Sequence, residues 1–206
     1  MSLKGDALYN VRLEIKDAAL REVFSGYLES LPEVLRTKPS SSSGKYHNPL
    51  ENGPNGLMIH SRSVVRLVDV ICEANNQDDR DELKFAAACH DLAKYGRDGN
   101  ELHTRRDHPL LGAQMLQDYR SRLRLKKKTV ESIERIKAMI RCHSGRWNTY
   151  TENGREKKMP KPKSMDERIL HWCDMISSSE WFRIQIDPER DYIQGEIPNH
   201  DFRHTP

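Results

Sequence analysis

The sequence lacks the features that mark membrane and secreted proteins. No stretch of the 206 residues approaches the roughly 20 consecutive apolar residues that a membrane-spanning helix needs. The N-terminal segment MSLKGDALYN has no apolar run of the kind found in a signal peptide. We therefore expect a cytoplasmic protein without a membrane partner.

Cysteine motifs and a strong charge of one sign are also missing. The four cysteines lie far apart and never form a C-x-x-C pair, which argues against a disulfide scaffold and a zinc knuckle. The net charge of +3, from 34 basic and 31 acidic residues, is too small to indicate nucleic acid as the partner. Hydrophobic residues make up 36% of the chain, which is enough for one core. Nothing in the composition indicates an oligomeric state.

Helical periodicity dominates what is present, and strand signals are nearly absent. Residues 39–56 and 146–163 are rich in loop-forming or polar residues, and the tail after Asp187 is interrupted by proline. Ser164 and Glu167 form a capping-box pattern at the start of the last predicted helix. The predicted helices cover residues 6–38 with a break at Pro32, residues 57–71, Asp79–Tyr95 ending at Gly96, His108–Arg122, Thr129–His143 and Ser164–Phe182. The fold class is therefore all-α.

Several of the nine histidines lie on the apolar faces of these helices. His60 shares a stripe with Val64 and Leu67, and His143 follows Met139 and Ile140 at helical spacing. A titratable group at a buried position is costly unless it is paired or binds a metal. A single core histidine is commonly structural, but the same pattern recurs on successive helices, at His60, His90, Asp91, His143 and Asp174.

The adjacent pair His90-Asp91 indicates a metal. Neighbouring residues on a helix point about 100° apart, so both side chains can reach one ion only at a seam between two helices. Imidazole and carboxylate together suit Mn, Fe, Co, Ni or Zn, whereas Mg prefers oxygen ligands.

The ordered series His60, His90-Asp91 and Asp174 resembles the signature of the HD-domain metal-dependent phosphohydrolase superfamily. The segments GPNGLMIHS, AAACHDLAKYG and ILHWCDMISS resemble the family's local motifs. Two more, DHPLLGAQML with His108 and IRCHSG with His143, resemble the binuclear branch, which includes HD-GYP proteins and the HD domain of a bacterial 3′→5′ exoribonuclease. The chain departs from that branch at Ser144, where relatives often have a second histidine.

The resemblance implies an HD-domain helical bundle with a metal site at its centre. The implied domain covers residues 45–185, after an N-terminal helical extension and Ser-rich loop (1–44) and before an irregular tail (186–206). The site would hold one or two divalent transition metal ions, with Asp91 bridging them when two are bound, and Lys94 would neutralise charge on the phosphoryl oxygens. The implied ligands are His60, His90 and Asp174 for one ion, and His108 and His143 for the other.

Basic and aromatic residues beside these motifs are candidates for contact with substrate. A solvated basic surface is an alternative for the arginines, and an aromatic residue that closes a helix end is an alternative for Trp147. The candidates are Lys45, His47, Arg105, Arg106, Arg146 and Trp147.

The function predicted from the sequence is hydrolysis of a nucleotide phosphoester or phosphoanhydride by metal-activated water. The basic segments 124–128 and 155–163 support a nuclease or cyclic-nucleotide phosphodiesterase as an alternative, so nucleic acid remains a possible partner. A non-catalytic metal- or nucleotide-binding regulatory module is the alternative from another class. Lys94 beside a complete ligand set argues against it, because a binder needs no such cation.

Overall fold

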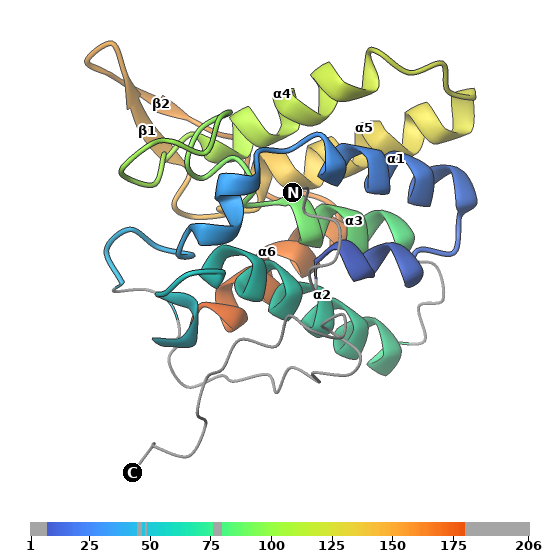
Figure 1. Cartoon of the computed structure of the whole chain (residues 1–206), viewed down its shortest axis with the longest axis horizontal. Coiled ribbons are helices and arrows are strands. Elements are labelled where there is room, and N and C mark those ends of the chain that lie inside the picture. Colours follow the sequence, from blue (N-terminus) through green and yellow to red (C-terminus); the bar gives the residue numbers. More distant parts are fainter. Residues whose placement is uncertain (1–7, 45–46, 48, 76–79, 180–206) are drawn as a thin grey trace.

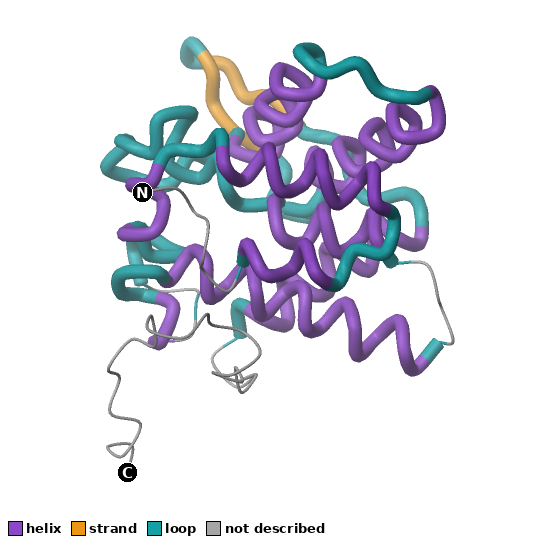
Figure 2. Tube along the Cα trace, turned by 45° about the vertical axis from the view of Figure 1, so that its right-hand side comes forward, coloured by secondary structure: helices purple, strands orange, loops and turns teal. Residues whose placement is uncertain are grey.

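The all-α prediction is confirmed by a computed structural model, which describes residues 8–44, 47, 49–75 and 80–179. Within these ranges the chain forms a bundle of α-helices with one small hairpin (Figures 1 and 2). No helix in the described part is long and apolar enough to cross a membrane. The α-helices are α1 (Ala18–Glu29), α2 (Gly56–Ala74), α3 (Asp81–Cys89), α4 (His108–Arg120), α5 (Lys127–Cys142) and α6 (Met165–Ser177), with 3₁₀ helices η1 (Tyr9–Leu13), η2 (Glu33–Thr37) and η3 (Pro49–Glu51).

The short helix α3 lies in the middle of the bundle. It packs against α1, α2, α5 and α6, with α4 and α5 on one side of it and α2 and α6 on the other (Figure 1). Its apolar residues are buried on several faces, as expected for a central helix, and Phe85, Ala86, Ala87 and Ala88 are fully buried. The chain that leaves the end of α3 therefore emerges among the ends of the surrounding helices.

The prediction that residues 6–38 are helical with a break only at Pro32 is wrong. The chain breaks after η1, and α1 begins only at Ala18 because Asp17 caps it, accepting hydrogen bonds from the N–H groups of Ala19 and Leu20. The break predicted at Pro32 is confirmed, since α1 ends at Glu29 and η2 follows. Helix α1 contacts α3, α4 and α5, so this segment covers the same core.

The second predicted helix is shorter than expected. Helix α3 ends at Cys89 rather than at Tyr95. Beyond it, hydrogen bonds from a backbone N–H to the carbonyl three residues earlier continue as far as Gly96. The φ of Gly96 is 81°, which is left-handed as predicted. The His90 imidazole donates to the Ala87 carbonyl, to which the Asp91 N–H would bond in a continuing helix. One of the residues that carry the candidate site thus stands at the end of α3 and bonds back to the helix.

Residues 146–163 form more than the predicted loop. The strands β1 (Thr149–Glu152) and β2 (Arg155–Lys158) pair in an antiparallel hairpin. Its two-residue turn has φ of 51° at Asn153 and 72° at Gly154, and Asn-Gly is the preferred pair for such turns. Strand β2 consists of exposed charged residues, and β1, with the sequence TYTE, has no alternation of apolar residues, so the periodicity of the sequence did not indicate either strand.

The remaining helices agree with the prediction. Helices α4 and α5 differ from the predicted segments by one or two residues at an end. The capping box of Ser164 and Glu167 is present at the start of α6, which ends at Ser177 rather than at Phe182. The predicted tail 186–206 lies outside the described residues. The predicted domain boundaries stay predictions.

Candidate metal centre

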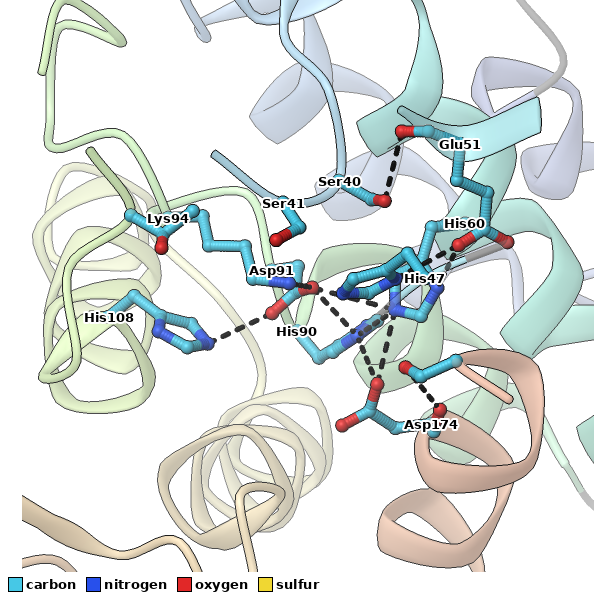
Figure 3. A network of polar contacts seen from close by, with 12 residues as sticks. Ser40, Ser41, His47, Glu51, His60, His90, Asp91, Lys94, His108 and Asp174 are labelled. Carbon is cyan, nitrogen blue, oxygen red and sulfur yellow. Dashed lines mark hydrogen bonds and ion pairs between the residues drawn. The ribbon is translucent and has the colours of Figure 1, made fainter. Parts of the chain in front are cut away.

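Six residues predicted as metal ligands come together at the centre of the bundle, and Figure 3 shows them apart from His143. Most of them stand at a helix end or in the following turn, and the packing around α3 brings those ends together. They are His60 on α2, His90 and Asp91 directly after α3, His108 at the start of α4, His143 at the end of α5 and Asp174 on α6.

A first group of four side chains converges from α2, α3 and α6. The Nε2 atom of His60 lies 3.1 Å from Oδ1 of Asp174 and 3.3 Å from Nε2 of His90. Oδ2 of Asp91 lies 3.5 Å from the His60 nitrogen and 3.4 Å from the His90 nitrogen. All four residues therefore aim one ligand atom at a common point.

A second group shares Asp91 with the first. Its other oxygen, Oδ1, lies 2.9 Å from Nε2 of His108 and 3.4 Å from Nε2 of His143, and these two nitrogens are 3.1 Å apart. The carboxylate thus offers one oxygen to each group. This is the arrangement that a carboxylate bridging two ions requires.

In three of the histidines, a hydrogen bond at Nδ1, on the ring edge away from the candidate ligand atom Nε2, determines the tautomer of the neutral ring. Nδ1 of His90, His108 and His143 each lies within hydrogen-bond distance of the backbone carbonyl three residues earlier, at 2.7, 2.6 and 2.8 Å. A carbonyl only accepts, so each Nδ1 donates and each neutral ring keeps its lone pair on Nε2. Second bonds of this kind orient metal-binding histidines.

The two groups fit a divalent ion by their chemistry. In the neutral tautomers that hydrogen bonds at Nδ1 select, the imidazole Nε2 atoms and carboxylate oxygens that face one another around Asp91, at 2.9 to 3.5 Å, are all acceptors. Ligand bonds of about 2.0–2.2 Å place neighbouring ligand atoms roughly 2.9–3.5 Å apart around one ion. The mixture of imidazole and carboxylate suits first-row transition ions. The residues present could therefore hold such an ion in each group.

The electrostatics of the centre depend on its burial and on Lys94. Burial opposes the charge of Asp91, but Lys94 and His90 hold the pKa of that carboxyl well below its usual range. Nζ of Lys94 lies 2.5 Å from Oδ2 of Asp91. Burial would lower the pKa of His90, yet the carboxylates of Asp91 and Asp174 raise it to about 10. In the metal-free protein the first group thus favours a proton on His90, for which a cation would compete, whereas burial lowers the pKa of His143 in the second group.

The predicted substrate contacts fall into different environments. His47 lies at the centre, with its ring centroid 4.6 Å from that of His60, whereas Lys45 is outside the described residues. Arg105 is held by both oxygens of Asp107 at 2.9 and 2.8 Å, so its charge is already paired. Arg106 is exposed.

Arg146 and Trp147 follow the end of α5, close in sequence to His143. The Arg146 guanidinium lies over the Trp147 ring at 4.1 Å from its centroid, and the Trp147 side chain is 52% exposed. The alternative in which Trp147 closes a helix end against the core does not fit this exposure. Its role in binding substrate stays a prediction.

One functional candidate was missed in the sequence. Glu51 is 3% exposed, and its Oε2 lies 3.2 Å from Nδ1 of His60 and 3.0 Å from Nδ1 of His47. It sits in a stretch that reads as loop by composition, so periodicity gave no reason to single it out. The four-residue spacing of His47 and Glu51 is the signal that could have found it.

A comparison with family models supports the motif-based prediction. The model described as HD domain matches residues 57–178, which is more than half of the chain and runs from α2 to α6. The searches of curated proteins and of solved structures gave no significant match. All six candidate ligands lie inside the matched segment, whereas His47 and Glu51 precede it. The chain belongs to the HD domain family.

Proposed function

We propose that the protein hydrolyses a phosphoester or phosphoanhydride bond of a nucleotide. Membership of the HD domain family indicates metal-dependent phosphohydrolase activity in general. The observation that supports it most strongly in this chain is the placement of Asp91. Its two oxygens face two separate sets of imidazole nitrogens, those of His60 and His90 and those of His108 and His143.

The chain's own residues would hold one or two divalent transition ions. His60, His90, Asp91 and Asp174 would hold the first, and Asp91, His108 and His143 the second. Such ions, when bound, polarise phosphoryl oxygens and make water a nucleophile at neutral pH. The second set offers fewer protein ligands than the first, so we expect the second ion to bind more weakly.

Lys94 supplies a cation of the protein's own beside Asp91. Its side chain is 11% exposed, and its ammonium contacts the Asp91 oxygen that faces the first set. An ammonium has three donors, so two remain for substrate oxygens while one holds the carboxylate. A fixed positive charge in a sheltered site stabilises the negative charge that develops during phosphoryl transfer.

The choice of a nucleotide rests on the pair Arg146 and Trp147. An exposed indole offers a face for stacking a base, and a guanidinium beside it can pair with phosphate. A nuclease or cyclic-nucleotide phosphodiesterase is the second candidate, supported by strand β2, whose residues Arg155, Lys157 and Lys158 are all exposed.

A hydrolysis screen tests the proposal. Purified protein is incubated with deoxynucleoside triphosphates, nucleoside monophosphates, cyclic dinucleotides and short RNA, each with Mn, Co, Ni or Mg. Release of triphosphate, pyrophosphate or orthophosphate from a mononucleotide supports the proposal, and shortening of RNA or opening of a cyclic dinucleotide favours the second candidate. Absence of any product, with tight binding of nucleotide, would instead support a regulatory module.

A further inference from the structure

The carboxylate of Glu51 lies beside the candidate metal centre but aims at neither ion position. Its Oε2 contacts Nδ1 of His60, the ring edge opposite the Nε2 atom that faces Asp174 (Figure 3). The same oxygen contacts Nδ1 of His47. Glu51 therefore joins two buried imidazoles, and burial makes its position costly to change.

The backbone of Glu51 is itself held in place. Its carbonyl oxygen accepts hydrogen bonds from both the N–H and the hydroxyl of Ser40, at 2.9 and 3.0 Å. The same oxygen lies so close to Gly56 that a Cβ there would be 1.8 Å from it. A residue other than glycine would thus displace Glu51, which is fixed between the N-terminal segment and the start of α2.

His60 needs a partner of this kind because of its position. The other candidate ligand histidines stand at helix ends, where a backbone carbonyl is available to their Nδ1 atoms. His60 lies inside α2, where the carbonyls of the preceding turn bond to the helix's own N–H groups. The Ser177 hydroxyl, at 3.3 Å from Nδ1, can donate as well as accept, so it does not select a tautomer. An ionised carboxylate can only accept a hydrogen bond. The contact with Glu51 therefore requires a proton on Nδ1 of His60 and selects that tautomer.

We propose that Glu51 is a positioning residue that holds the His60 ring with Nδ1 protonated and Nε2 free for the first metal ion. The proposal rests on the proposed function only in assuming that this centre binds ions. It places part of the working site, Ser40 and Glu51, before the segment that matches the HD domain family. Through the same oxygen Glu51 orients His47, leaving the Nε2 lone pair of that ring available as an acceptor.

Cobalt titration of metal-free protein, followed by visible absorption, tests the proposal without substrate. Glu51→Gln keeps the shape of the side chain but loses an ionised acceptor. We expect the first Co²⁺ to bind about 10–100-fold more weakly, which is the usual effect of losing such a partner. Binding at His108 and His143 should change less. Glu51→Asp retains the carboxylate on a shorter side chain, and we expect an affinity between those of the parent and Glu51→Gln.

The matched control is Glu14→Gln. Glu14 forms a 2.5 Å ion pair with Arg62, a buried residue two positions after His60 on α2. This variant should lower the melting temperature yet leave the affinity for Co²⁺ unchanged, which separates damage to α2 from loss of ring orientation. A parent that binds no ion would overturn the proposed function itself. Parent-like affinity in Glu51→Gln, or in Glu51→Asp if the first variant fails to fold, would overturn the role of Glu51 alone.

Discussion

Replacement of Lys94 by methionine separates metal binding from phosphoryl-group stabilisation. The Lys94 ammonium contacts Asp91 but belongs to neither set of candidate ligands. Methionine preserves most of the packing of the stem and removes only the charge. We therefore expect Lys94→Met to retain its ions and to bind substrate while turning it over slowly.

The magnitude follows from the shelter of the site. The Lys94 side chain is 11% exposed, and one charged contact to a transition state in such a site contributes about 2–4 kcal/mol. This range corresponds to a fall in kcat of roughly 30- to 900-fold, because each 1.36 kcal/mol is a factor of ten. The assay compares kcat and metal content of parent and variant on the best substrate from the hydrolysis screen.

Lys84→Met is the matched control. The Lys84 side chain is 12% exposed and pairs with Asp69 at 2.9 Å. The Lys84→Met variant therefore loses a similar ion pair away from the centre. It should lower stability and leave kcat unchanged. Full activity in Lys94→Met, or an equal loss in both variants, would refute the assignment of Lys94 to the chemistry.

Three further predictions concern the ions and the protons that replace them. Asp91→Ala should bind almost no metal by elemental analysis, since both sets share that carboxylate; stoichiometric metal would contradict a bridging role. His108→Ala should retain one ion where the parent retains two at high metal supply, and two ions in the variant would contradict the proposed second set. In the metal-free protein, the pKa of His90 is raised to about 10, above the ordinary value of about 6.5. Its contribution to stability is fully present below pH 6.5 and is lost as the pH rises through 10. Urea denaturation should therefore give a lower free energy of unfolding at pH 9 than at pH 6.5, and equal values would contradict the shift.

The candidate centre was predictable because its residues break the apolar pattern of helices. His60 and His143 occupy core-facing positions where a polar side chain is costly, and that cost made them stand out. His90 and Asp91 stand together at the end of α3, so the packing of α3 brings them to the other helix ends. Helical periodicity thus made it possible to predict both the fold and these candidate ligands.

Features that leave no helical periodicity in the sequence were not predicted. Glu51 ends the three-residue helix η3 and acts through contacts 9 residues away on α2 and 4 residues away before η3, and so short an element has no repeating pattern to interrupt. The hairpin is signalled only by Asn153-Gly154, because β2 is exposed throughout, β1 is only partly buried, and neither strand has an apolar alternation. The break before α1 depends on a single capping residue, Asp17, within an otherwise helical pattern.

The most direct test of the account is an anomalous-diffraction map of crystals grown with excess Mn²⁺. The account predicts a peak among His60, His90, Asp91 and Asp174, and a second, weaker peak among Asp91, His108 and His143. A single peak in the first set would leave a mononuclear centre with His108 and His143 free to contact phosphate. A map with no peak on either side of Asp91, in crystals where these side chains keep their arrangement, would contradict the central claim.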